Sequence, residues 1–285
     1  MVSPRVKRQA VRCLVDDHNF SQRRACQLVG IPRSTARYQP RRGADDGAFV
    51  AEVRDFAYRF PQHGYRHITA RMRREGYPVN HKRVERIWRQ EGLQLPRRKT
   101  VKRRFGERGE VKKRAQHPNH VWSYDFTEDR AENGQRVRIL AVMDEYTREC
   151  LMIYAAKSIR SDRVIDLLHW LFATRGVPQH IRSDNGPEFV AHRVQQWLAN
   201  QGSQTLYITP GSPWENPFIE RFFETMKHES LNRYLFDRGA EAQIILDNFM
   251  DDYNRFRPHS SLADLTPVEF RQQYQQQQFL TPTGT

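Results

Sequence analysis

The chain has 285 residues, a formal net charge of +14, 38% hydrophobic residues and 28% charged residues. No apolar run approaches the ~20 residues that a membrane-spanning helix needs, so the composition excludes a membrane protein and leaves room for two or three domains. The three cysteines are few and widely spaced, which excludes a disulfide framework and a cysteine-rich zinc cluster and favours the cytoplasm.

Positive charge is concentrated in the first part of the chain. Residues 1–116 hold 30 of the 47 Lys and Arg residues and 11 of the 33 Asp and Glu residues, a net charge of +19. Residues 117–285 have a net charge of −5. Because a strongly basic segment is typical of polyanion binding, we expect the first part to bind a polyanion. We expect the acidic second part to hold metal.

Residues 1–42 are predicted to form a basic helix-turn-helix unit. A helix starts after Ser21, a residue type that caps helices, and stops at Gly30, and a short second helix follows. This spacing is typical of helix-turn-helix proteins, so Arg33 and Arg37 are predicted to contact DNA. A basic helical hairpin without sequence recognition is the alternative.

Residues 48–95 are predicted to form a second helix-turn-helix DNA-binding domain. Its last helix begins after the cap Asn80, and Val84, Ile87 and Trp88 form one apolar stripe. The opposite side of this helix is basic, and the alternative to DNA contact is that this side is simply exposed to solvent. The basic side chains predicted to lie there and to contact DNA are Lys82, Arg83, Arg86 and Arg89.

Two segments lack any apolar period. Residues 96–116 are rich in Lys and Arg, so they are expected to form an extended basic linker that follows phosphates. Residues 276–285 are expected to be a disordered tail. The segment between them, residues 117–275, is predicted to be the catalytic core.

The core segment has the pattern of a mixed sheet. Three strands with short connections suggest an antiparallel meander, and two later strands alternate with helices. These strands are predicted over residues 121–127, 136–144, 150–156, 180–184 and 205–208. The expected fold is therefore an α/β core, a five-stranded mixed sheet flanked by helices, preceded by all-α units.

Three acidic residues are candidates for one site in this core. Asp125 lies on the polar face of an alternating strand, and Asp184 ends another strand just before the turn pair Asn185-Gly186. Glu220 lies near the start of an amphipathic helix. The alternatives are a strand-edge charge for Asp125 and a turn-forming role for Asp184. Because three gathered carboxylates repel one another, we expect two magnesium ions about 3.5–4 Å apart, with manganese as a substitute.

The helix that carries Glu220 is predicted to begin at Pro217, with Asn216 as its cap. Glu224 and Glu215 compete with Glu220, and Glu224 is expected to be a surface residue or a supporting one. Asp144 also ends a strand and is expected to be structural, with a fourth acid of the site as the alternative.

A later helix over residues 240–254 is predicted to turn four side chains toward the core. They are Ile244, Ile245, Phe249 and Tyr253. The last predicted helix covers residues 267–274.

The acids and their spacing resemble a known signature. Asp125, Asp184 and Glu220, with 35 residues between the last two and Lys227 seven after the Glu, resemble the DDE signature of retroviral-type integrases and bacterial transposases. Further motifs resemble the transposase of the insertion sequence three family, and the resemblance covers about residues 20–275. They are Trp122-Ser-Tyr-Asp125, Asp184-Asn-Gly186, Ser212-Pro-Trp-Glu-Asn216, Glu220-Arg-Phe-Phe223 and Tyr253-Asn-Arg-Phe-Arg-Pro-His259.

The resemblance implies a ribonuclease-H-like core and a DDE-type polynucleotidyl transferase that cleaves and transfers DNA strands of a bacterial insertion sequence. It implies that Asp125, Asp184 and Glu220 are the catalytic and metal-binding residues and that Lys227 points to bound DNA. Arg257-Pro-His-Ser-Ser-Leu262 resembles the closing motif of the family and is expected to pack or to contact DNA.

The implied partners follow from the same resemblance. They are double-stranded DNA, both element terminal repeats and target DNA, further copies of the chain in the DNA complex, and an upstream-frame protein as a fusion partner. The implied location is the bacterial cytoplasm, at the nucleoid.

Two other functions stay open. The chain could be a catalytically inactive or partner-dependent DNA-binding half of a frameshifted transposase that acts as a regulator. It could also be a ribonuclease or junction nuclease that uses the same acids, but this leaves the basic amino-terminal part unexplained.

Overall fold

The computed structural model describes residues 3–38, 46–96, 113–183, 192–208 and 216–280. The chain divides into two compact units, residues 1–55 and residues 56–285. No helix in these described ranges is long and apolar enough to cross a membrane.

Residues 3–38 of the first unit form three short helices around a small core. Ser21 precedes the second helix and its Oγ accepts a hydrogen bond from the Arg24 N–H, while Gly30 ends that helix in the left-handed region at φ +62°. The predicted start and stop of this helix are therefore confirmed. The helices are α1 (Pro4–Asp16), α2 (Gln22–Val29) and α3 (Arg33–Ala36), and the buried residues between them are Val11, Ala25, Cys26 and Ile31.

Three further helices precede the sheet: α4 (Asp46–Arg59), α5 (Tyr65–Arg74) and α6 (His81–Gln90). The side chain of Asn80 accepts a hydrogen bond from the Lys82 N–H at 2.9 Å, which confirms it as the cap of α6. The stripe of Val84, Ile87 and Trp88 is buried, also as predicted.

The sheet has five strands in the order β3-β2-β1-β4-β5. Strands β1, β2 and β3 are antiparallel neighbours, and β4 and β5 continue the sheet in parallel with β1. The predicted mixed five-stranded sheet is confirmed. Its strands are β1 (Val121–Arg130), β2 (Arg136–Asp144), β3 (Cys150–Ala156), β4 (His180–Ser183) and β5 (Gln204–Tyr207).

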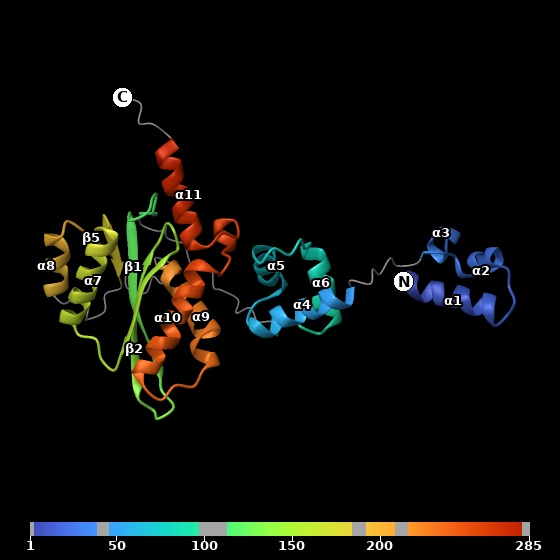
Figure 1. Cartoon of the computed structure of the whole chain (residues 1–285), viewed down its shortest axis with the longest axis horizontal. Coiled ribbons are helices and arrows are strands. Elements are labelled where there is room, and N and C mark those ends of the chain that lie inside the picture. Colours follow the sequence, from blue (N-terminus) through green and yellow to red (C-terminus); the bar gives the residue numbers. More distant parts are fainter. Residues whose placement is uncertain (1–2, 39–45, 97–112, 184–191, 209–215, 281–285) are drawn as a thin grey trace. The chain divides into compact units, whose positions relative to one another are not determined.

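Helices cover both faces of this sheet (Figure 1). On one face α7 (Ser161–Arg175) and α8 (His192–Asn200) pack on Trp122, Leu140 and Val142. On the other face α9 (Pro217–Glu229) and α10 (Gly239–Arg255) pack on the alternate side chains of β2. The remaining elements are the 3-10 turns η2 (Leu231–Arg233) and η3 (Ser260–Leu262) and the helix α11 (Pro267–Leu280).

Two expectations for the carboxyl-terminal helices are wrong. Ile244 is 62% exposed, and Leu246 is buried in its place. The reason is that α10 turns the face that carries Leu246 toward the sheet. α11 continues to Leu280, so residues 276–280 are helical where a disordered tail is expected. The Gln-rich segment has no helix-breaking residue, and Gln is a good helix former.

Candidate active site

Asp125 faces the α9 side of the sheet. Along β1, Trp122 and Tyr124 point into the layer of α7 and α8, so the alternate residues Ser123 and Asp125 point to the opposite face. Asp125 lies opposite Ala141 of β2, which belongs to the core under α9 and α10. Its side chain is half-buried, and Oδ1 accepts a hydrogen bond from the Phe126 N–H at 2.7 Å.

Glu220 lies in the first turn of α9 and is exposed. The helix is anchored by its apolar stripe, which is buried against β2 and β3 and consists of Ile219, Phe222, Phe223 and Met226. α9 contacts both β1 and β2. The structure therefore brings the elements that carry Asp125 and Glu220 together on one face of the sheet.

The expected cap of α9 is wrong in one respect. Pro217 is the first helical residue, as predicted, but the side chain of Asn216 makes no capping hydrogen bond. Asn216 has φ −124° and ψ 46°, away from the extended conformation of a typical N-cap, and it is buried.

Asp184 and Glu215 lie outside the described residues. The described part of β4 ends at Ser183, and β4 pairs in parallel with β1, with Arg182 opposite Ser123. Within the described ranges, no group of three His, Cys, Asp or Glu side chains is placed to hold a metal ion.

A buried polar cluster that the sequence did not predict lies on the same sheet face as Asp125. Glu145 and Arg182 are each only 1% exposed. Arg182 Nε donates to Glu145 Oε1 at 2.7 Å, and the Ser123 hydroxyl donates to the same oxygen. The cluster therefore joins β1 and β4 two residues before Asp125 along β1. An available signal was the period of two along each strand, which puts Ser123 on the face of Asp125.

Comparison with family models gives two matches to an integrase core domain, over residues 115–213 and 201–267. Residues 45–100 match an HTH-like domain. The first match contains strands β1 to β5, and the second contains α9 and α10.

Several curated relatives align over most of the chain. An uncharacterized 31.7 kDa protein of insertion element IS407 from Burkholderia multivorans is 36% identical over 252 residues, which are 88% of this chain and 91% of that protein. An uncharacterized 39.2 kDa protein of insertion element IS476 from Xanthomonas euvesicatoria is 34% identical, over 97% of this chain and 80% of that protein. The putative transposase InsK for IS150 from Escherichia coli is 29% identical, over 85% of this chain and 90% of that protein.

The chain belongs to the insertion sequence three family of transposases. The resemblance stated from the motifs is thereby confirmed, and the chain is a polynucleotidyl transferase of the integrase and transposase type. Among solved structures, the transposase resembles a chain of the simian T-cell lymphotropic virus intasome in complex with PP2A regulatory subunit B56 gamma. The TM-score is 0.51 at 18% identity, over 77% of this chain and 74% of that one. That similarity supports the ribonuclease-H-like fold of the core.

Two other acids of the transposase have the expected structural or surface roles. Asp144 is buried and accepts hydrogen bonds from the backbone N–H groups of Asn119, Tyr146 and Thr147, at 2.7 to 2.9 Å. Glu224 is exposed and pairs with Arg221 at 2.8 Å. Neither observation favours a catalytic or metal-binding role for Asp144 or Glu224.

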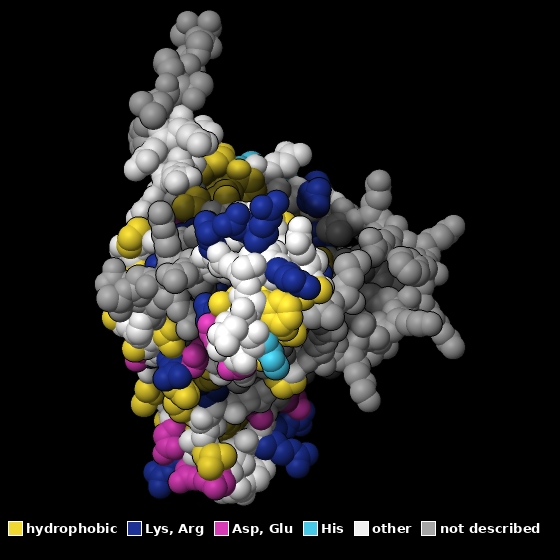
Figure 2. Space-filling view, turned by 90° about the vertical axis from the view of Figure 1, so that its right-hand side faces the viewer, with side chains coloured by type: hydrophobic (Ala, Val, Ile, Leu, Met, Phe, Trp, Pro, Cys, Tyr) yellow, Lys and Arg dark blue, Asp and Glu magenta, His cyan; other side chains and the backbone are white. Residues whose placement is uncertain are grey.

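The predicted DNA contacts of the transposase lie mainly on exposed helix faces, and Figure 2 shows exposed Lys and Arg side chains in dark blue on the face that it presents. Arg33 and Arg37 are exposed on and just after α3. On α6, Arg83 is half-buried, and Arg89 pairs with Glu85 at 2.6 Å. Lys227, in the last turn of α9, is half-buried. The other basic residues of α6 are exposed, namely Lys82 and Arg86.

The closing motif Arg257–Leu262 packs inside the transposase, where Leu262 is buried. His259 is buried, its Nε2–H donates to the Tyr253 carbonyl oxygen at 3.1 Å, and its ring lies edge-on to the Tyr253 ring. Arg257 donates to both carboxylate oxygens of Glu229, at 2.8 and 2.9 Å. The packing role expected for this motif is confirmed.

We expect acid to destabilise the second unit through two histidines. Burial, and then the nearby Arg257 charge, lowers the pKa of His259 to about 3 and that of His67 to about 4. Because the unfolded chain takes up these protons near pH 6.5, this stabilisation is complete above pH 6.5 and is lost as pH falls toward 4. Between about pH 6 and 4.5, each His should contribute a slope of about 1.4 kcal/mol per pH unit, measured by urea unfolding, whereas the slope above about pH 7 should be close to zero.

The matched pair for this measurement is His67→Gln and His169→Gln. His169 is exposed on α7, so its replacement should leave the slope unchanged, whereas His67→Gln should flatten it. Equal slopes in both variants and the wild type would contradict the prediction.

Proposed function

We propose that this transposase cleaves and transfers DNA strands with Asp125, Asp184 and Glu220 as its catalytic, metal-binding carboxylates. The observation that supports the proposal is that β1, which carries Asp125, and α9, which carries Glu220, contact each other at one face of the sheet. Asp184 is included because it directly follows β4, the parallel neighbour of β1.

Magnesium suits this donor set, and manganese is its expected substitute. Asp125 is half-buried and Glu220 is exposed, so both offer carboxylate oxygens where a partly hydrated ion can approach. When bound, a pair of such ions would lower the pKa of the attacking water or 3′-hydroxyl and stabilise the leaving 3′ oxygen.

The protein contributes orientation and charge. The Phe126 N–H holds the Asp125 carboxylate, and the buried stripe of α9 fixes the turn that carries Glu220. Fixed carboxylates need little reorganisation at the moment of reaction. No covalent bond between the protein and DNA is needed.

The basic helix faces position the DNA in this proposal. Lys and Arg side chains bind phosphates without reading sequence, and they make affinity depend on salt. We assign this role to basic residues of α3, α6 and α9 and to the residue that follows α3. They are Arg33, Arg37, Lys82, Arg83, Arg86, Arg89 and Lys227.

The proposed partners are element terminal repeats and target DNA at the bacterial nucleoid. Joining two DNA ends requires two active sites, so we also propose a homo-oligomer in the DNA complex, and an upstream-frame protein as a fusion partner. A DNA-binding regulator without activity is not favoured, because the chain matches the integrase core over residues 115–213 and 201–267 and relatives are named as transposases.

Strand transfer by the purified chain tests the proposal. A labelled duplex from the end of its own element, incubated with a supercoiled plasmid and magnesium, should become joined to the plasmid. Chelation of the metal with EDTA should abolish the joined product, and RNA or branched substrates should react poorly. Duplex binding without any strand cleavage or joining, in magnesium and in manganese, would contradict the proposed function.

A further inference from the structure

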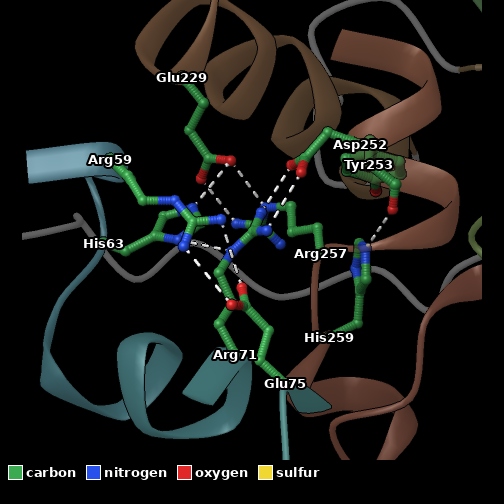
Figure 3. Close-up of polar contacts among 9 residues, drawn as sticks. All are labelled: Arg59, His63, Arg71, Glu75, Glu229, Asp252, Tyr253, Arg257 and His259. Carbon is green, nitrogen blue, oxygen red and sulfur yellow. Dashed lines mark hydrogen bonds and ion pairs between the residues drawn. The ribbon is translucent and has the colours of Figure 1, made fainter. Parts of the chain in front are cut away.

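The helices that precede the sheet are tied to the catalytic core by an ion pair between the buried Arg71 and the half-buried Asp252 (Figure 3). Arg71 of α5 donates from its two terminal nitrogens to the two carboxylate oxygens of Asp252 on α10, at 3.1 and 2.6 Å. The Arg71 side chain is only 6% exposed, and its guanidinium lies 3.9 Å from the centre of the Phe60 ring. This bidentate, stacked geometry fixes the orientation of α5 on α10.

A chain of hydrogen bonds continues from Arg71 to the end of α9. Arg71 Nε–H donates to His63 Nδ1 at 3.3 Å, so the proton of the His63 ring is on Nε2. That nitrogen lies 3.1 Å from Glu229 Oε2, to which it donates. Arg257 then binds both oxygens of Glu229. The network therefore runs without a break from Asp252 to Arg257.

Glu229 stays ionised at the centre of this network. Burial alone would raise its pKa, but hydrogen bonds from His63 and Arg257 outweigh burial and hold the pKa well below its ordinary value. A second ion pair supports the junction, because Arg74 of α5 binds both oxygens of Glu269 at 2.7 Å. Glu269 lies in the first turn of α11 and also accepts from the Thr266 N–H.

The network connects two helices with different proposed functions. α5 packs against α6, whose outer face carries the basic residues proposed to bind phosphates. Glu229 is the last residue of α9, the helix whose first turn contains Glu220. An ion pair of this kind adds little net stability relative to apolar packing, so its expected role here is to orient α5 on α10.

We propose that Arg71, His63 and Glu229, with Asp252, form a positioning link between the DNA-binding helix α6 and the active-site helix α9. The link holds α6 at one orientation to Glu220, so that DNA seated on α6 enters the active site with its scissile phosphate in place. This inference rests on the proposed function, and it assigns positioning residues outside the acid triad.

The test compares neighbouring aspartates of α10 in the full-length chain. Asp252→Ala removes the acceptor of Arg71, whereas Asp251→Ala removes only an exposed pair with Arg255 at 2.8 Å. For Asp252→Ala, we expect the joining rate at saturating element-end duplex to fall about tenfold or more, because small misplacements of reacting groups are costly. The Kd for the duplex should stay within about twofold, since the basic face of α6 is unchanged.

Rescue separates positioning from folding. Asp252→Glu keeps a carboxylate for Arg71 and should recover most of the joining rate, and Asp251→Ala should match the wild type. Glu229→Gln, which keeps the side-chain shape but not the charge, is the second break if Asp252→Ala lowers the melting temperature. It should also reduce joining without weakening duplex binding.

The possible failures are distinct. A wild type that joins DNA together with an Asp252→Ala variant that joins equally fast overturns the positioning link and leaves the proposed function intact. Joining rates and melting temperatures that fall in parallel, without rescue by Asp252→Glu, also overturn it. A wild type that binds the duplex but never joins it overturns the proposed function instead.

Discussion

Replacing Asp125 with Asn should abolish DNA cleavage and joining, with a loss of about 10³-fold or more. The amide keeps the shape of the side chain and an oxygen that can accept from the Phe126 N–H, but it removes the negative charge that a divalent cation requires. Because Asp125 is half-buried and its neighbours are unchanged, the melting temperature and the Kd for element-end duplex should stay close to those of the wild type.

The chain offers a matched control on the same strand. Asp129 lies on the same face of β1 and accepts a hydrogen bond from the next backbone N–H, that of Arg130, at 2.8 Å, as Asp125 does from Phe126. Asp129→Asn should therefore join DNA at the rate of the wild type. For the helix, Glu220→Gln should be inactive and Glu224→Gln, one turn later, should be active.

Both measurements use labelled duplex and plasmid target in magnesium, with product resolved by electrophoresis. Joining by Asp125→Asn or Glu220→Gln at a rate near that of the wild type would remove these residues from the catalytic assignment. Retained strand transfer in Asp184→Ala would do the same for the third acid.

Replacing Arg182 with Leu should destabilise the catalytic core by about 3–5 kcal/mol. The substitution removes the guanidinium that donates to Glu145, so a carboxylate that is 1% exposed loses its charged partner. The resulting penalty is the cost of a buried, uncompensated charge. Urea unfolding at pH 7.5, followed by circular dichroism, measures the loss.

Two further variants test this cause. In Arg182→Leu combined with Glu145→Leu, both charges are gone, so much of the lost stability should return. Arg193→Leu removes an exposed pair with Asp162 and should cost less than about 1 kcal/mol. If Arg182→Leu unfolds at the urea concentration of the wild type, the buried pair does not contribute as we expect.

Local sequence patterns predicted most of the elements. Apolar runs separated by short connections placed β2 and β3 at their observed bounds, Arg136–Asp144 and Cys150–Ala156. Ser21, Gly30 and Asn80 marked helix ends through hydrogen bonds and backbone angles that involve only nearby residues. Such signals depend on a few neighbouring positions, so they can be found without knowledge of the fold.

Local patterns failed where several choices satisfy the same period. The run Ile244-Ile245-Leu246 offers three apolar side chains to α10, and only packing on the sheet decides that Leu246 is buried and Ile244 exposed. Asn216 has a residue type that caps helices, but the chain enters α9 with other backbone angles. For the acid site, spacing and motif selected Asp125 and Glu220, and the fold placed their elements on one sheet face.

The sequence alone determined the strands and most helices, the separation of basic and acidic parts, and the family of this transposase. The tertiary structure alone decided which charges meet. Arg71 and Asp252 are 181 positions apart, and Arg182 and Glu145 are 37 apart, yet each pair forms close hydrogen bonds. No local period encodes such pairs, because their distance depends on how whole helices and strands pack. Charged residues that would be solvated on isolated elements thereby become the buried links between them.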